Sequence, residues 1–390
     1  MKKICGISTK AVTIRAFMID NLNYVADNGY ESFCISNPSD IMTKKLLGKV
    51  RFIPIEMQWG NVSPFELIKQ IYRFYKIFRK ERFDVIQFVT ANAGLYAAVA
   101  GWLARVPVRV FLQWGIAYPD YTGPKLWFYK FMEKLTCSFS THVQPDSYSN
   151  LNFAISEKLY KPAKGSVVYN GSACGVNLSR FNIDNREKWK IEVFNQFKLH
   201  GYRKVFGFVG RVVPEKGINE LLKAFLKLEN QHQYALMLVG STDEVSRLDR
   251  SVYEESLKHD NIIYTGRVSE PEHYFSAFDF MVLPSYREGF GMVVLEAAAV
   301  GTPSIISNIK GPTDFVVDGF NGLICEVQSV DSLQHRIITA IDMSEDAYKE
   351  MSKHAYRTVK DKFDAESFKK EFLTNRNQLL KEYERRNPST

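Results

Sequence analysis

The chain has few of the groups that build disulfide frameworks or metal sites. Its 390 residues include five cysteines, an odd number, which are scattered and form no C-x-x-C pair. The seven histidines do not fall at the spacing of a zinc site. This composition predicts a reduced, cytoplasmic protein without a structural metal, and no cofactor is expected.

Long apolar runs and common nucleotide-binding glycine patterns are also missing. The best candidate for a membrane span, AGLYAAVAGWLA at residues 93–104, ends at Arg105 and is too short to cross a bilayer, so it predicts a buried helix. The beginning, MKKICGISTKAVT, is basic but lacks the apolar core of a signal peptide. Neither G-x-G-x-x-G nor the P-loop pattern occurs, which disfavours ordinary dinucleotide and P-loop sites.

Positive charge is in excess. The formal net charge is +8, with a pI near 9.0, and suits a nucleic acid, an anionic membrane surface or a phosphorylated substrate. Residues 71–83 (IYRFYKIFRKERF) and 125–134 (KLWFYKFMEK) mix basic and aromatic residues, as helices on anionic bilayers do. The alternative is two solvated helices whose aromatic rings face the core. No DNA- or RNA-binding motif is present, so no nucleic-acid partner is expected.

The order of apolar segments predicts two α/β domains. Short strand-like runs alternate with helical patterns from KICGIS onward, and the same alternation restarts at VFGFVGRV after a charged region at residues 181–204. Such alternation indicates parallel sheets covered by helices on both faces. We expect an N-terminal Rossmann-like domain at 1–185 and a C-terminal one at 186–368. A last amphipathic helix, at 369–390, would pack back on the N-terminal domain.

Two cations follow one predicted strand of the second domain. In GFVGRVVPEKG the strand ends at Gly210, Arg211 comes next, and Lys216 immediately precedes a helix. Cations beside a helix N-terminus, at the carboxyl end of a parallel strand, are typical of an anion site. The alternative is two surface cations on a loop.

Two glutamates flank a second strand–loop–helix junction, PSYREGFGMVVLEAAAVG. Gly289 and Gly291 would let the backbone approach a ligand, and Glu288 and Glu296 would accept hydrogen bonds from hydroxyl groups on either side. A diphosphate between two hydroxyl-bearing groups is the shape of a nucleotide-sugar. The alternative is one acid that complements the helix dipole and one unrelated interior glutamate.

These motifs resemble a known family. GRVVPEKG, YTGRV, LPSYREGFGMVVLEAAAVGTPSI and VVDGFNGLI occur in the order and spacing of retaining GT-B glycosyltransferases of family 4. FDVIQFVTANAGLYAAVAGWLARVPVRVFLQWG is similar to the N-terminal domain of the bacterial surface-polysaccharide members. The resemblance covers most of the chain.

The resemblance implies that the N-terminal domain at 1–185 binds the acceptor and that the C-terminal domain at 186–368 binds the nucleotide-sugar donor. It also implies roles for individual residues. Arg211 and Lys216 would hold the donor diphosphate, Glu288 the donor sugar, and Glu296 the ribose. Further donor contacts would come from Gly266, Arg267, Val268, Gly289, Phe290, Gly291, Met292 and Leu295. On the acceptor side the chain departs from the family, because Trp114 stands where many members have a histidine, and Ser8 and Thr9 replace a common glycine pair. Trp114 could stack on sugar or belong to the core.

The activity implied is transfer of a hexose or N-acetylhexosamine with retention of anomeric configuration. A UDP-sugar is the favoured donor, and a lipid-linked glycan of capsule or O-antigen assembly is the expected acceptor. No D-x-D carboxylate pair occurs, so no catalytic metal is expected. The enzyme would lie at the inner face of the plasma membrane, held by residues 71–83 and 125–134. A GT-B epimerase, a synthase with a soluble acceptor, and a non-catalytic scaffold are the alternatives.

Overall fold

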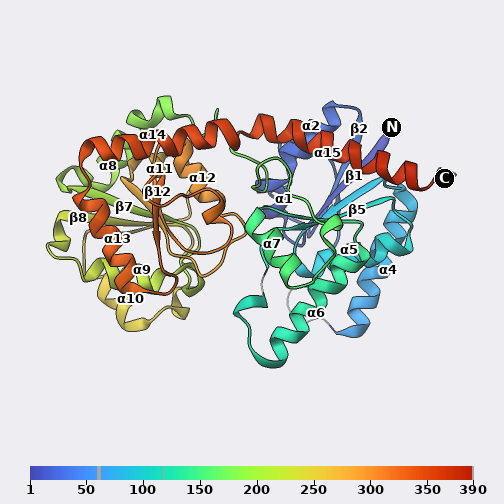
Figure 1. Ribbon diagram of the computed structural model, residues 1–390, viewed down its shortest axis with the longest axis horizontal. Coiled ribbons are helices and arrows are strands. Elements are labelled where there is room, and N and C mark those ends of the chain that lie inside the picture. Colours follow the sequence, from blue (N-terminus) through green and yellow to red (C-terminus); the bar gives the residue numbers. More distant parts are fainter. Residues whose placement is uncertain (59–62, 117, 389–390) are drawn as a thin grey trace. The chain divides into compact units, whose positions relative to one another are not determined.

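The computed structural model describes residues 1–58, 63–116 and 118–388 (Figure 1). The chain forms two compact units, one made of Met1–Cys174 with Glu366–Thr390 and the other of Gly175–Ala365. Val176 and Phe181 precede the boundary expected at residue 185, yet both are buried in the core of the second unit. The chain therefore enters that unit earlier than its sequence indicated.

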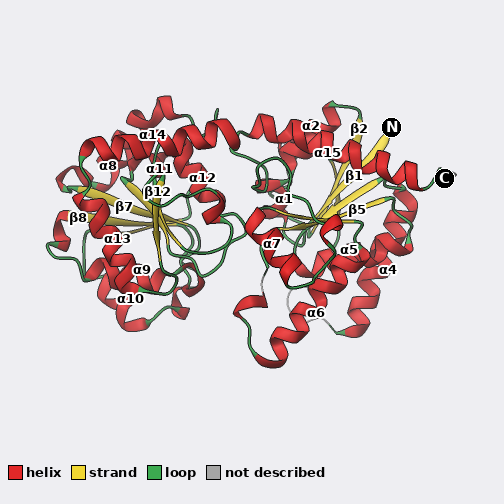
Figure 2. Cartoon of the chain, viewed as in Figure 1, coloured by secondary structure: helices red, strands yellow, loops and turns green. Residues whose placement is uncertain are grey.

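The first unit is a parallel sheet between helices (Figure 2). Its strand order is β3-β2-β1-β4-β5-β6. The strands are β1 (Lys2–Ile7), β2 (Tyr30–Ser36), β3 (Arg51–Pro54), β4 (Val85–Phe88), β5 (Val108–Gln113) and β6 (His142–Pro145). The helices are α1 (Ala11–Phe17), α2 (Ile19–Asp27), α3 (Lys44–Leu47), α4 (Pro64–Glu81), α5 (Ala91–Leu103), α6 (Gly123–Phe139), α7 (Tyr148–Ser156) and α15 (Ala365–Arg386).

Each face of this sheet carries its own core. Alternate residues of β1 point to opposite faces, so Cys5 packs with α4, α5 and α6 while Ile4 packs with α1, α2 and α15. The expected membrane-span candidate is α5, which is largely buried. The apolar stripe of α15, which includes Phe372 and Leu380, completes the second of these cores. The last helix thus belongs structurally to the unit that begins the chain.

The two basic aromatic segments differ in what they expose. Within residues 71–83, the rings of Phe74, Phe78 and Phe83 are buried in the core, so the aromatic membrane face expected there is wrong for these three. Helical spacing explains this, because the i, i+4 pair in α4 faces the sheet. In α6, by contrast, Trp127 and Phe131 are 69% and 60% exposed.

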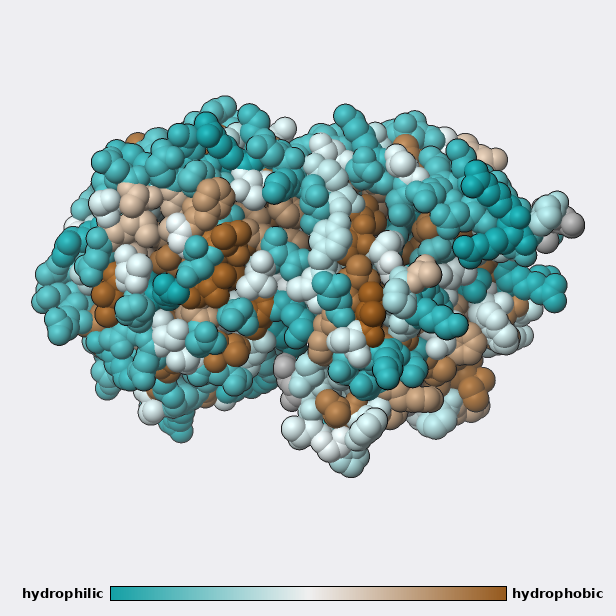
Figure 3. All heavy atoms as spheres, viewed as in Figure 1, coloured by the Kyte–Doolittle hydropathy of each residue, from teal (hydrophilic) through white to brown (hydrophobic). Residues whose placement is uncertain are grey.

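The exposed apolar side chains of α4 and α6 contribute to the apolar surface of the first unit. Figure 3 shows brown and tan atoms at the lower edge of this unit, over the region where Figure 1 draws the two helices. The exposed members are Phe65, Ile68 and Tyr72 on α4 and Trp127, Phe128 and Phe131 on α6. Within the described residues, no helix is both long and apolar enough to cross a membrane.

The second unit has a parallel sheet of order β12-β11-β10-β7-β8-β9. The strands are β7 (Lys204–Val209), β8 (Tyr234–Val239), β9 (Ile262–Gly266), β10 (Phe280–Leu283), β11 (Ser304–Ser307) and β12 (Gly322–Cys325). The helices are α8 (Arg186–Phe197), α9 (Ile218–Leu226), α10 (Arg250–Ser256), α11 (Pro271–Ala277), α12 (Met292–Ala299), α13 (Val330–Asp342) and α14 (Glu345–Lys362).

Burial in this unit follows the sequence pattern. Every residue of β8 is buried, as expected for a strand covered on both faces. The stripe of α9 that begins at Ile218 and ends at Phe225 faces the core. The expected architecture of two Rossmann-like parallel sheets is confirmed.

Candidate functional site

The chain order of the second sheet creates a topological switch point. β7 is the first strand of this unit, and its successors β8 and β10 lie on opposite sides of it. The connection after β7 therefore runs to one side of the sheet, and the connection after β10 runs to the other. The carboxyl ends of β7 and β10 thus form a topological switch point, where α/β sheets bind ligands. The two loops there are residues 210–217 and 284–291, which carry both sequence constellations.

These two loops are locked together through a glycine. Gly217 has a φ of +70°, and a Cβ atom built on it would lie 2.0 Å from the carbonyl oxygen of Pro284. The backbone N–H of Tyr286 also donates to the carbonyl of Glu215 across 3.0 Å. Only glycine permits this contact, so the loop that carries Lys216 is held against the loop that carries Glu288.

Lys216 and Glu288, 72 positions apart in sequence, meet at this junction. The Lys216 Nζ forms an ion pair with Oε1 of Glu288, and the same oxygen accepts from Ser285 Oγ across 2.8 Å. The two charged side chains are 24% and 13% exposed. A partly buried cation beside an oriented carboxylate can bind a phosphate and a sugar hydroxyl at neighbouring positions.

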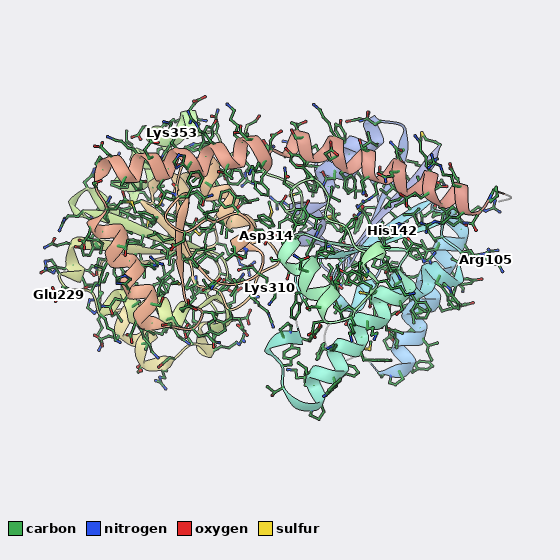
Figure 4. All side chains as sticks on the ribbon, in the orientation of Figure 1. Arg105, His142, Glu229, Lys310, Asp314 and Lys353 are labelled. Atoms are coloured by element: carbon green, nitrogen blue, oxygen red, sulfur yellow. The ribbon has the colours of Figure 1, made fainter. Side chains whose placement is uncertain are left out.

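Glycines also shape the start of α12. Gly291 caps this helix with a φ of +80° and no side-chain cap, so its neighbouring N–H groups are not taken by a capping side chain. Gly311, with a φ of +94°, brings the loop after β11 so close that a Cβ atom would lie 1.9 Å from the carbonyl oxygen of Gly289. That loop also carries Lys310 and Asp314, which Figure 4 labels.

The side chains between these glycines are anchors rather than contacts for a ligand. Phe290 is 2% exposed and packs on Phe363, with ring centroids 5.3 Å apart. Leu295 is fully buried, and Met292 is half-buried against the same core. Of the expected donor-binding residues, these three therefore position backbone groups of the loop and helix.

Glu296 lies in α12, as expected, with its carboxyl group in a poorly hydrated environment. Burial raises its pKa from the ordinary value of 4.5 to about 7, while the nearby Arg180 lowers it and Glu272 raises it. Arg180 forms an ion pair with Glu272, to whose carboxylate its Nε and Nη2 donate hydrogen bonds across 3.1 and 3.0 Å. No local sequence pattern indicated this pair, because its members lie 92 positions apart.

Arg211 is more exposed than the other expected phosphate contact. Its side chain is 62% exposed, and Nη1 donates to Oε1 of Glu244 across 2.9 Å. Arg247 contacts the other oxygen of Glu244 across 2.8 Å and also pairs with Glu215. The structure thus places Arg211 in a surface network of two arginines and two glutamates that sequence reasoning had missed.

The expected nucleobase border lies at the end of β9. The carbonyl of Gly266 accepts from the N–H of Gly240 across 2.9 Å, which joins the ends of β9 and β8. Arg267 pairs with Asp243 across 2.6 Å, and Val268 packs partly against the core. A Cβ atom on Gly266 would meet no atom within 4 Å, so open space adjoins this backbone.

The acceptor-side candidates lie in the first unit, near its own switch point between β1 and β4. Ser8 and Thr9 are buried just after β1, and the hydroxyl of Thr9 lies 2.9 Å from that of Thr90, which follows β4. Thr90 has a φ of +72°, a strained conformation for a β-branched residue. Trp114 packs edge-on against Phe17, with ring centroids 5.7 Å apart, as a packing residue does.

The expected absence of a metal remains a prediction. In the part of the chain that the structure describes, no group of three or more histidine, cysteine, aspartate or glutamate side chains is placed to hold an ion. The five cysteines are free thiols, four of them buried.

Two doubly wound α/β units, with a cation–carboxylate pair at a switch point, define a two-domain enzyme that acts on phosphorylated ligands. Comparison with known families gives the class. Residues 190–358 match the family "Glycosyl transferases group 1", and residues 3–147 match "Glycosyl transferase 4-like".

Individual relatives agree with these matches. The chain is 28% identical to the capsular polysaccharide biosynthesis glycosyltransferase CapM of Staphylococcus aureus over 83% of this chain and 84% of CapM. It is 25% identical to the UDP-Gal:alpha-D-GlcNAc-diphosphoundecaprenol alpha-1,3-galactosyltransferase of Escherichia coli over 79% of each chain. HepE of Anabaena, solved with UDP and glucose, has the same fold, with a TM-score of 0.79, 17% identity, and coverage of 97% of this chain and 100% of HepE. The chain therefore consists of two glycosyltransferase domains in the GT-B fold, the first similar to the 4-like family and the second to group 1.

Proposed function

We propose that the chain is a retaining, metal-independent glycosyltransferase that moves a hexose or N-acetylhexosamine from a nucleotide-sugar to a lipid-linked glycan. The observation that carries this proposal is the Lys216–Glu288 pair at the switch point of the second unit. The E. coli relative, whose name specifies a UDP-sugar donor and a diphosphoundecaprenol-linked acceptor, favours UDP-sugar and a lipid-linked acceptor here. CapM favours surface-polysaccharide assembly.

The diphosphate is held from two sides in this proposal. Lys216 supplies a charge next to the N-terminus of α9, and Arg211 supplies a second when it leaves Glu244. Opposite them, the backbone N–H groups around Gly289 and Gly291 face the same switch point. The backbone N–H groups are fixed before the reaction, so they stabilise the charge that grows on the leaving diphosphate without reorganisation, whereas Arg211 must first leave Glu244.

The carboxylates would bind the hydroxyl-bearing ends of the donor. Glu288 accepts hydrogen bonds from the transferred sugar, and its position is fixed by Ser285 and Lys216. Glu296 accepts from the ribose, which stabilises its ionised form in a site that otherwise raises its pKa. The open backbone at Gly266 leaves room for the base, with Arg267 and Val268 beside it.

In the transfer step, the bond between the anomeric carbon and the β-phosphate oxygen breaks. The acceptor oxygen bonds to the same face of that carbon, and its proton passes to the departing phosphate oxygen, so configuration is retained. Lys216 neutralises the diphosphate as it leaves. The proposed step requires no divalent cation, because the Lys216 ammonium and the helix N-terminus neutralise the charge that a metal ion would otherwise neutralise.

The deciding experiment is transfer from UDP-sugars to a polyprenyl-diphosphate-linked acceptor by the full chain and by Glu288→Gln. Turnover should fall by at least about 100-fold, the usual effect of losing one group that acts in the transition state. Glu229→Gln, an exposed acid, is the matched control. Near-normal turnover in Glu288→Gln would overturn the role of this residue. Conversion of the sugar without any acceptor would instead indicate an epimerase, and no turnover with intact nucleotide binding would indicate a scaffold.

We further propose that the first unit rests on an anionic membrane surface at the inner face of the plasma membrane. The support is the set of exposed rings on α6, with Lys125 before them and Lys130 among them. Replacing Trp127 and Phe131 by serine should abolish flotation with phosphatidylglycerol vesicles, and reversing the charges of Arg79 and Lys80 should weaken it. Equal flotation of all these variants would refute the membrane proposal and leave the transferase proposal untouched.

A further inference from the structure

A polar groove opens in the first unit at the opposite end of the sheet from Ser8 and Thr9. It encloses about 720 Å³ beside the beginning of β6, at His142. All strands of this sheet are parallel, so the amino end of β6 lies at the edge away from the carboxyl-terminal loops. Figure 4 labels His142 in this unit. None of the residues assigned to the donor or the acceptor lines the groove.

The walls come from two distant parts of the chain. One wall is a single face of α15, formed by Asn375, Gln378, Glu382 and Arg386 at helical spacing. The other wall is formed by the end of α6, the start of β6 and residues 159–166, which pair with the free edge of β6 through Gly165. A ligand in the groove would therefore touch α15 and the body of the unit together.

The groove is electropositive. Lys161, Lys164 and Arg386 line it, and within the described residues none of the three has a carboxylate within 4.0 Å. Lys164 Nζ donates to the carbonyl of Ser138 across 3.1 Å. One acid, Glu382, also lines the groove and accepts from Gln378 across 3.1 Å, so three cations face one carboxylate.

His142 lies in the same positive field. Burial lowers its pKa to about 4, and although Glu382 opposes this, Arg376, Arg386 and Lys164 lower it further. The imidazole is thus neutral at physiological pH and can donate one hydrogen bond to a ligand without adding charge. Its Nδ1 lies 3.0 Å from the Thr141 hydroxyl, which leaves Nε2 toward Glu382, 4.0 Å away.

We propose that this groove is a second ligand site, which binds a phosphate-bearing molecule through Lys161, Lys164 and Arg386. Its volume lies in the range of pockets for small organic ligands. Three cations without acid partners provide the charge-assisted hydrogen bonds that phosphate oxygens accept. The site is separate from the proposed donor site, so it does not depend on the proposed function.

Occupancy of the groove would act on α15. The Asn375 side chain, on the groove wall, accepts from Gln144 Nε2 across 2.9 Å and from Arg376 Nη1 across 2.6 Å. Arg376 in turn donates to Gln87 in β4. A ligand that holds Lys164 and Arg386 together fixes the outer turns of α15 on the unit whose core this helix completes, and so stabilises the folded unit.

The test measures the affinity of the full chain for inositol hexakisphosphate by calorimetry at physiological salt. Lys161→Gln/Lys164→Gln and, separately, Arg386→Gln should each weaken binding by about tenfold or more, since tenfold corresponds to one modest charge contact. Lys381→Gln, the same charge change on an exposed residue of α15 outside the groove, should bind as the unaltered chain does. Equal affinity in the groove variants would overturn the proposal.

Two further arms locate the phosphate and its source. Lys216→Ala should keep probe binding, and its loss there would assign the probe to the donor site and overturn the groove proposal. Phosphatidylglycerol vesicles replace the soluble probe in the last arm. If only the binding of vesicles depends on Lys161 and Lys164, the natural ligand is a lipid headgroup. If only the binding of the soluble probe depends on them, the natural ligand is a free phosphorylated metabolite. If neither does, the site does not exist.

Discussion

Replacing Glu296 by glutamine tests whether this carboxyl group is kept at a cost to stability. The burial that raises its pKa from 4.5 to about 7 favours the neutral acid. A glutamine has nearly the same shape and is never charged, so it removes the ionisation cost and keeps the packing of α12. The structure therefore predicts that Glu296→Gln is more stable than the unaltered chain at alkaline pH.

The magnitude follows from the link between protonation and folding. A folded pKa above the unfolded value means that stability is fully present below pH 4.5 and is lost as the pH rises through 7. A difference of one in pKa corresponds to about 1.4 kcal/mol, so the loss between pH 5 and pH 8 is about 2–3 kcal/mol for this group. Glu296→Gln should gain that amount relative to the unaltered chain over the same pH range.

The assay is urea unfolding of both proteins at pH 5 and pH 8, followed by a probe in the second unit such as the fluorescence of Trp189. Glu229→Gln, which changes an exposed acid labelled in Figure 4, controls for net charge and should show no pH-dependent gain. If Glu296→Gln gains no stability at pH 8 relative to pH 5, the carboxylate is already solvated and the reasoning fails. The same variant should bind UDP more weakly, because its amide oxygen is a poorer acceptor than a carboxylate.

Other parts of the site give further expectations. Gly217→Ala must place a Cβ atom against the carbonyl oxygen of Pro284. It should therefore lower the free energy of unfolding by about 1–3 kcal/mol and weaken UDP binding. Thermal shift with and without UDP measures both effects. Gly319→Ala, with positive φ but open space, is its control, and equal losses would refute the loop contact. Arg211→Gln should lower turnover at least tenfold, whereas Arg250→Gln, which removes an exposed ion pair, should not, and equal rates in both would remove Arg211 from the site. Transfer should persist in excess chelator, and a loss restored by added Mg²⁺ would contradict the metal-free mechanism.

Most elements of the fold were predictable because their apolar patterns are strong, and two were not. β6, HVQP, has four residues at a sheet edge, too few to show a period. α8 lies in the charged region at residues 181–204, where no helix was expected, and it buries only Trp189 and Val193 among twelve residues. Trp189 stacks on His273 of α11, a contact between distant segments that no local pattern announces.

At the site, the sequence supplied the residues and the fold supplied their partners. The sequence predicted that Gly289 and Gly291 let a ligand approach the backbone, and this stays a prediction. The close backbone contacts in the structure are those of Gly217 with Pro284 and of Gly311 with Gly289. The pairing of Lys216 with Glu288 was not predictable from spacing, since it depends on β7 and β10 being neighbours. The ion pair between Arg211 and Glu244 was not predictable either, because the folded loops bring these two exposed side chains together.

The assignment of α15 to the first unit has a consequence for how the protein is made. That unit takes Phe368, Phe372 and Leu380 from the last helix into its core, while the second unit is a single continuous segment. During synthesis, the first 174 residues leave the ribosome early, yet one face of their sheet is covered only by α1 and α2 until α15 has emerged. The second unit can reach its native packing first, although it is translated later, which reverses the usual order of domain folding. Until then, the nascent chain would present an apolar surface that chaperones recognise.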